Sequence, residues 1–199
     1  MSQSVRVYAT RHAELRAAVG SGDDAIVSRT EEGFADDLDD LDDASETGED
    51  HGLGLTAWEA LAELVGGELS LDPGDGDDLY SRVFTVLCHA HGDWLLDERL
   101  NARDVAWLTR LDETLRAGGV PLRISTLRCR AGVVDNAGVE RVLDVGFWTA
   151  EEVATARPSL DALLLTVPEG EDRDALEAIR QWCDALTEYP ECVLMGSFC

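Results

Sequence analysis

Acidic residues dominate this chain, and their number is the strongest constraint on how it can fold. The 199 residues include 41 aspartates and glutamates but only 16 basic residues, all of them arginine, so the formal net charge is −25. Because an unpaired carboxylate is costly to bury, these side chains must stay in water around an apolar interior. Hydrophobic residues make up 45% of the chain, which is enough for a core without disulfides or metals.

The charge surplus allows two interpretations. Arginine without lysine, together with many carboxylates, is typical of a GC-rich genome or a high-salt cytoplasm, where salt screens the repulsion between acids. Alternatively, the acidic surface binds a basic protein partner. Direct binding to nucleic acid or to an anionic membrane is disfavoured, because both require clustered basic residues.

The expected compartment is the cytoplasm. No apolar run approaches the roughly 20 residues that span a bilayer, and the N-terminal residues lack the apolar core of a signal peptide. The five cysteines are widely spaced and form no CxxC pair, which favours reduced thiols over a disulfide framework. They are Cys88, Cys129, Cys183, Cys192 and Cys199.

Hydrophobic spacing predicts an α+β fold, a mainly helical single domain over residues 1–199 with a small sheet. Strands are expected at residues 5–9 and 193–198, so both ends of the chain enter the sheet, and residues 120–128 and 139–147 are further extended candidates. The expected helices cover residues 11–19, 23–41, 57–65, 77–96, 103–117 and 171–188, with a short helix after Thr149. Thr56 and Glu59 form a capping box at the start of one of them.

Residues 36–50 are the most biased segment of the chain. The sequence predicts an acidic, solvated and flexible loop at about residues 42–54, because nothing apolar supports order there and like charges repel. The aspartates of this segment are candidates for an interaction surface: Asp36, Asp37, Asp39, Asp40, Asp42 and Asp43. Trp148 joins them as a candidate, because it stands beside Phe147 at a strand–helix junction where it could be exposed.

A cluster of potential metal ligands lies near the end of the helix expected at residues 77–96. His89 and Asp93 are four residues apart on one helical face, and Cys88 and His91 are three apart on a neighbouring face. Zinc accepts all three residue types, so these four residues are a candidate metal site, although no other cofactor is predicted. The alternative interpretation is a core thiol at Cys88 with solvent-facing histidines near a helix end.

Templates for catalysis are absent from the sequence. The Asp-Gly cluster at residues 72–78 does not have the spacing of a calcium loop, and no phosphate-binding or nucleophile-elbow motif occurs. A local basic cluster could bind an anion or a carboxylate, or could neutralise nearby acids; it consists of Arg123, Arg128 and Arg130.

Five segments, taken in order, are similar to a family of uncharacterised bacterial proteins classed only as a domain of unknown function. They are residues 15–24, 59–65, 87–92 and 145–153 and the terminal strand with Gly196. The resemblance implies one integrated domain and supplies no activity or catalytic residue.

Three functions therefore remain open. The first is a non-enzymatic acidic interaction protein that binds a basic partner, of the inhibitor or immunity type. The second is a metal-dependent or thiol-based protein that uses the cluster from Cys88 to Asp93. The third is an accessory protein whose acidity is only solvent adaptation.

Overall fold

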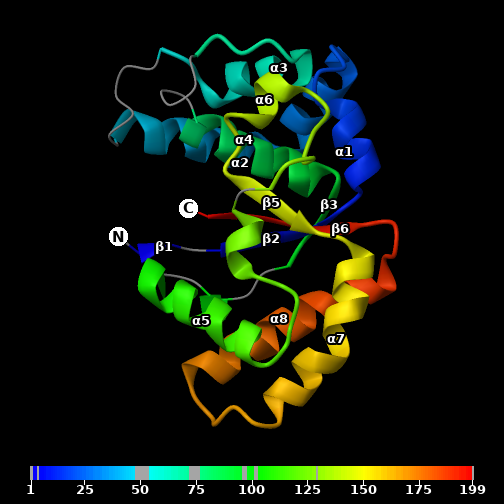
Figure 1. The fold of residues 1–199 in the computed structure, drawn as a ribbon. Helices are drawn as coiled ribbons and strands as arrows, with labels where there is room; N and C mark the ends of the chain where they lie inside the picture. Colours follow the sequence, from blue (N-terminus) through cyan, green and yellow to red (C-terminus); the bar gives the residue numbers. More distant parts are fainter. Residues whose placement is uncertain are drawn as a thin grey trace. The chain divides into compact units, whose positions relative to one another are not determined.

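The computed structural model describes residues 2–3, 5–47, 54–71, 77–95, 98–100, 103–128 and 130–198. The described helices are α1 (His12–Ala18), α2 (Asp24–Thr47), α3 (Ala57–Gly66), α4 (Asp77–Ala90), α5 (Val105–Ala117), α6 (Ala137–Glu140), α7 (Ala150–Leu164) and α8 (Glu171–Glu188), with 3-10 turns η1 (Glu98–Leu100) and η2 (Ile124–Leu127) (Figure 1). The described strands are β1 (Ser2–Gln3), β2 (Val5–Thr10), β3 (Gly92–Trp94), β4 (Arg103–Asp104), β5 (Val145–Trp148) and β6 (Val193–Phe198). The predicted α+β class, mainly helical with a small sheet that includes both terminal strands, is confirmed.

Contacts along the chain group its residues into two compact units, and neither is continuous in sequence. One, here called the sheet unit, comprises Met1–Arg11, Gly92–Arg130 and Val145–Cys199. The other, the helical unit, comprises His12–His91 and Ala131–Asp144. Each unit has its own interior of buried apolar side chains, as expected for a compact body of this size.

The sheet unit is organised around an antiparallel sheet of four strands in the order β3-β2-β6-β5. Strands β2 and β6 pair along their full length, from Val5 opposite Phe198 to Thr10 opposite Val193. The C-terminal strand is therefore internal to the sheet, with β5 on its other side and Gly146 opposite Gly196. Of the other two extended candidates, residues 120–128 contain the 3-10 turn η2, and only the end of 139–147 is a strand.

Two paired glycines let η2 lie directly on this sheet. A Cβ atom added at Gly146 would lie 1.9 Å from the carbonyl oxygen of Thr126, and one added at Gly196 would lie 2.7 Å from the Cβ of Leu127. Any side chain at these positions would push η2 away from the sheet, so glycine is required by the close approach.

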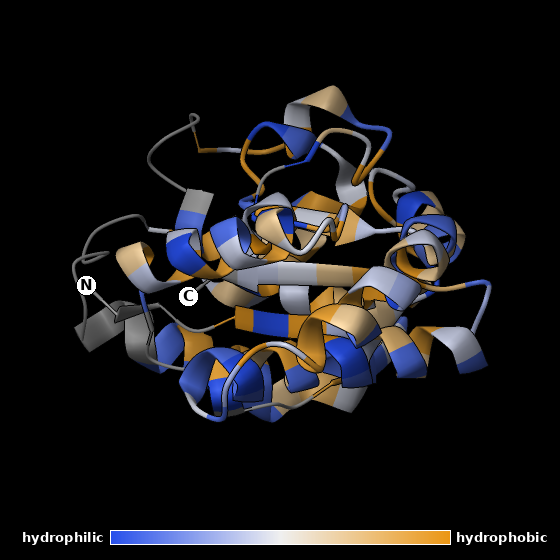
Figure 2. Cartoon of the chain, turned by 60° about the horizontal axis from the view of Figure 1, so that its bottom comes forward, coloured by the Kyte–Doolittle hydropathy of each residue, from blue (hydrophilic) through white to orange (hydrophobic). Residues whose placement is uncertain are grey.

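Helices α5, α7 and α8 complete the sheet unit by packing an apolar stripe into its core. The helices show alternating hydrophilic and hydrophobic bands in Figure 2, as amphipathic surface helices do. The core of the sheet unit combines side chains from helices, η2 and strands, including Leu111, Leu115, Ile124, Trp148, Leu160, Ile179, Trp182 and Leu194. Burial of such side chains contributes about 1.5–3 kcal/mol each to stability.

The helical unit is built from α2, α3 and α4, which pack against one another, together with α1 and α6. Its buried side chains include Leu15, Leu38, Leu61, Leu64 and Phe84. Thr56 accepts a hydrogen bond from the Glu59 amide while the Glu59 carboxylate accepts from the Thr56 amide, so the predicted capping box is confirmed.

Helix α2 corrects the prediction of a loop at about residues 42–54. The helix continues to Thr47, so the first six residues of that segment are helical; residues 48–53 lie outside the described part of the chain. Leu38 is fully buried and Leu41 is partly buried, and this apolar edge holds the helix on the unit in spite of the aspartates between them. The helix is kinked at Phe34, whose backbone dihedral angles are not helical.

We predict that Gly146→Ala lowers the free energy of unfolding by about 3 kcal/mol, because the added methyl group overlaps the Thr126 carbonyl. The matched control is Gly66→Ala in α3, where an added Cβ meets nothing within 4 Å. Chemical denaturation of both variants measures the difference, and equal stability would contradict the close approach.

Candidate functional site

The cluster from Cys88 to Asp93 does not lie on one helix. Helix α4 ends at Ala90, and Gly92 begins strand β3, in which Asp93 pairs with Ala9 of β2. A Cβ at Gly92 would lie 2.1 Å from the Ala9 carbonyl oxygen, so this glycine brings the chain close against β2. The expected row of His89 and Asp93 on one helical face is therefore wrong.

The other three residues of the cluster have different surroundings. Cys88 is fully buried, and burial raises the pKa of its thiol, which disfavours the thiolate needed for metal binding or nucleophilic attack. The His89 ring contacts the Phe34 ring at a tilt of 54°, with ring centroids 4.8 Å apart, and His91 Nδ1 lies 3.8 Å from Glu14 Oε2. Among the described residues, no group of three or more His, Cys, Asp or Glu side chains is arranged to hold a metal ion. The geometry gives the zinc alternative no support.

His91 instead lines a cavity in the helical unit, with a volume of about 520 Å³. Its walls come from α1, the turn between α1 and α2, the first half of α2, and the end of α4. The lining residues are Glu14, Ala17, Ala18, Ser21, Asp23, Ile26, Arg29, Thr30, Phe34, Ala90 and His91. The sequence did not predict this cavity. Most of its lining residues belong to segments that the sequence predicts only as amphipathic helices, and Ala90 and His91 come beside them only in the folded chain.

The aspartates predicted as an interaction surface lie on the second half of α2, and two of them have internal roles. Asp39 Oδ1 accepts a hydrogen bond from the Trp58 indole N–H at 3.1 Å, and Asp42 Oδ1 accepts from the Ala57 amide at the start of α3. An acceptor at a helix N-terminus satisfies an amide that has no partner within the helix. The other four side chains, Asp36, Asp37, Asp40 and Asp43, are exposed.

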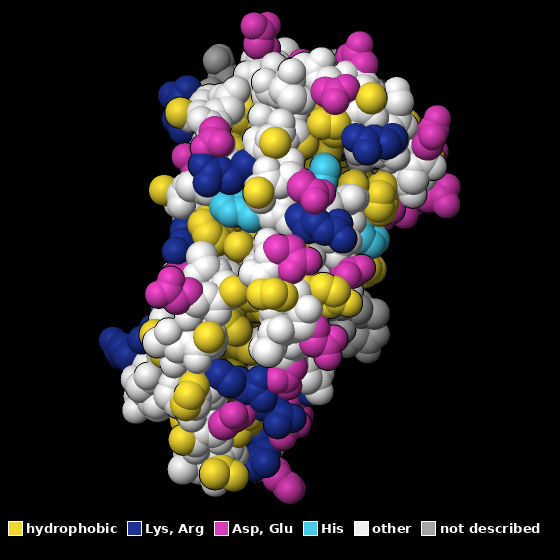
Figure 3. Space-filling model, turned by 90° about the vertical axis from the view of Figure 1, so that its right-hand side faces the viewer, with side chains coloured by type: hydrophobic (Ala, Val, Ile, Leu, Met, Phe, Trp, Pro, Cys, Tyr) yellow, Lys and Arg dark blue, Asp and Glu magenta, His cyan; other side chains and the backbone are white. Residues whose placement is uncertain are grey.

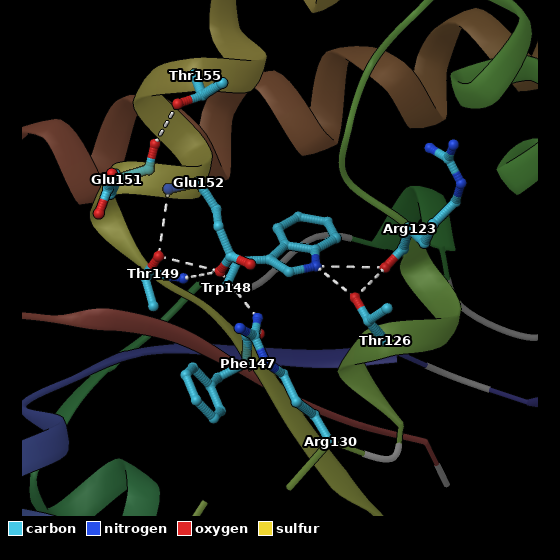
Figure 4. Close-up of polar contacts among 9 residues, drawn as sticks. All are labelled: Arg123, Thr126, Arg130, Phe147, Trp148, Thr149, Glu151, Glu152 and Thr155. Atoms are coloured by element: carbon cyan, nitrogen blue, oxygen red, sulfur yellow. Dashed lines mark hydrogen bonds and ion pairs between the residues drawn. The ribbon is translucent and has the colours of Figure 1, made fainter. Parts of the chain in front are cut away.

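Trp148 is not part of any exposed surface. Its side chain is 1% exposed, and the indole N–H donates to Thr126 Oγ1 at 2.8 Å and to the Arg123 carbonyl oxygen at 3.3 Å (Figure 4). The prediction of an exposed Trp148 is wrong because β5 lies beside β6 and under η2, so the strand–helix junction is covered.

Arg130, from the basic cluster noted in the sequence, holds the end of β5 and the start of α7 together. Its Nη1 donates to the Phe147 carbonyl oxygen at 2.7 Å and to Glu152 Oε2 at 2.8 Å, and its guanidinium stacks over the Phe147 ring (Figure 4). Burial raises the pKa of Glu152, but the hydrogen bonds from Arg130 and Thr149 outweigh it and leave that pKa below its usual value. Arg123 is likewise used internally, donating to the carbonyl oxygens of Val120 and Leu122. Arg123 and Arg130 therefore stabilise the sheet unit through internal contacts.

The fold thus defines an α+β protein with an acidic helical unit and a cavity within that unit. The family model described as domain of unknown function DUF7691 matches residues 1–196, and the chain belongs to that family. No curated protein and no solved structure matches it. In the described part of the chain, no helix combines the length and the hydropathy needed to cross a bilayer.

We predict that Trp148→Phe lowers the free energy of unfolding by about 1–3 kcal/mol, because the buried indole hydrogen bonds and part of the packing are lost. Trp94→Phe, at a side chain that is 44% exposed, is the matched control. Urea unfolding followed by circular dichroism distinguishes them, and a smaller loss for Trp148→Phe than for the control would refute the buried position.

Buried thiols should be unreactive in the folded protein. Burial raises the pKa of Cys183 to about 12 and that of Cys88 still further. In a variant with Cys129 and Cys199 replaced by serine, we expect Ellman's reagent to react at least about a hundredfold more slowly with native than with unfolded protein. Rapid reaction of one native thiol would contradict this expectation and would favour a thiol-based function.

Proposed function

We propose that this chain is a non-enzymatic binding protein whose acidic helical unit engages a basic protein partner. The observation that carries the proposal is the uneven distribution of charge. The helical unit contains 24 of the 41 acidic residues but only 4 of the 16 arginines, a formal net charge of −20. The sheet unit, with 17 acidic residues and 12 arginines, has a net charge of only −5.

This difference in charge between the two units favours binding of a basic partner over solvent adaptation as the reason for the acidity. A high-salt cytoplasm or a biased genome acts on every exposed position, so adaptation alone predicts similar acidity on both units. Concentration of charge in one unit is instead typical of a surface that recognises an oppositely charged partner. Two of the four arginines in the helical unit, Arg16 and Arg82, are already in ion pairs with Asp135 and Asp78.

The exposed aspartates of α2 provide the recognition surface. Asp36, Asp40 and Asp43 follow one another at helical spacings of four and three residues, so their side chains form one outward stripe opposite buried Leu38. Like charges at these spacings destabilise a helix by about 0.2–0.5 kcal/mol per pair. No lysine or arginine occurs between Arg29 and Arg82, a stretch that contains 18 acidic residues. A basic partner would relieve this repulsion, which gives binding a source of free energy.

A stripe of this kind favours fast association that weakens with salt. It suits an inhibitor or immunity-type protein, which covers the cationic face of its target without catalysing a reaction. Burial of Cys88 raises the pKa of its thiol, which disfavours a reactive thiolate in the helical unit.

The test compares two triple variants that change the net charge equally. Asp36→Asn, Asp40→Asn and Asp43→Asn together neutralise the stripe, whereas Glu113→Gln, Glu188→Gln and Glu191→Gln together neutralise exposed positions of the sheet unit. Each protein is used to capture partners from its native lysate at about 50 mM and about 500 mM salt.

We expect the wild type and the sheet-unit variant to recover the same basic protein at low salt, and the stripe variant to bind it at least about tenfold more weakly in a titration with the purified partner. Equal affinity of the two variants for the partner would show that the aspartate stripe is not the recognition surface. Recovery of no basic protein at either salt concentration would favour solvent adaptation.

A further inference from the structure

The cavity of the helical unit is separate from the aspartate stripe and has the size of a small-molecule site. Its volume of about 520 Å³ falls within the range of about 300–1,000 Å³ found for ligand pockets. The stripe lies beyond the kink at Phe34, whereas the part of α2 that lines the cavity runs from Ile26 to that kink.

Small and apolar side chains form much of the cavity wall. Ala17 and Ala18 of α1, Ile26 and Phe34 of α2, and Ala90 at the end of α4 all line it. Three alanines leave room that larger side chains would have filled, and the Phe34 ring also contacts the tilted ring of His89. Such a wall suits the apolar body of a ligand.

Charged groups of both signs complete the wall. Glu14 and Asp23 contribute carboxylates, and Arg29 contributes a guanidinium. Histidine side chains also lie among carboxylates and arginines on the face of the molecule shown in Figure 3. Opposite charges around an apolar wall are complementary to a ligand that itself carries both an ammonium and a carboxylate group.

Local hydrogen bonds restrain the Asp23 and Arg29 side chains. Asp23 Oδ1 accepts from the Ala25 amide at 2.9 Å, and Arg29 Nε donates to the Ala25 carbonyl oxygen at 3.1 Å. Glu14 lies beside His91, with 3.8 Å between Oε2 and Nδ1. Restrained polar groups lose less conformational entropy when a ligand binds, which favours affinity for a small molecule.

We propose that this cavity binds a small zwitterion with an apolar body, of the apolar α-amino acid class. The ligand's ammonium group lies toward the carboxylates of Glu14 and Asp23, its carboxylate pairs with the planar donors of Arg29, and its side chain packs on the alanines and Phe34. This function goes beyond the binding of a basic protein and does not depend on it.

The test uses the full chain and sets of matched probes. Leucine and phenylalanine are compared with isopentylamine and phenethylamine, which lack the carboxylate, and with 4-methylpentanoate and 3-phenylpropanoate, which lack the ammonium group. Binding is measured by isothermal titration calorimetry and by amide chemical-shift changes in two-dimensional NMR spectra. We expect at least one of the two amino acids to bind, with shifts concentrated at the cavity residues, and both of its analogues to bind at least about tenfold more weakly.

Arg29→Gln should weaken binding of that amino acid at least about tenfold, because a charge-assisted contact to the carboxylate is lost. Arg82→Gln, which removes another arginine of the helical unit that is paired with Asp78, should leave the affinity unchanged. The proposal is overturned if neither amino acid binds, if the amine analogue binds as tightly as the amino acid, or if both arginine variants bind like the wild type.

Discussion

The fold of the sheet unit depends on the pairing of the two ends of the chain. Strand β6 lies between β2 and β5, so it supplies hydrogen bonds to both neighbours, and the sheet would have no continuous centre without it. A sheet whose central pair joins residues nearly 200 positions apart has a high contact order, because the loop between them must close before the pair can form. Synthesis of the last strand therefore precedes completion of the sheet.

One segment that suggested the family has a structural explanation. Gly146 allows η2 to approach the sheet, and Trp148 donates its indole hydrogen bond to Thr126 within that same turn. Thr149 and Glu152 then cap α7, and Arg130 donates hydrogen bonds both to Glu152 of this cap and to the Phe147 carbonyl oxygen in β5. Residues 145–153 therefore form a junction of strand, turn and helix within the sheet unit.

The charge asymmetry has a physical basis in how the chain is divided. The sheet unit pairs several of its arginines with acids, as Arg157 does with Asp161 and Asp184. The helical unit has few cations, so repulsion along α2 must be offset by burial of Leu38 and by the use of Asp39 and Asp42 as hydrogen-bond acceptors. The binding proposal rests on the carboxylates that remain exposed.

Helical periodicity, the Thr56–Glu59 capping box, the two terminal strands and the charge surplus can all be read from the sequence, because they depend on composition or on residues close together in the chain. The separation of His89 and Asp93 onto a helix and a strand, the burial of Trp148 and the cavity that Arg29 helps to line follow only from the tertiary structure. Each of these depends on a contact with a distant segment, such as the close approach that a glycine permits, and local patterns contain no information about which segment will be there.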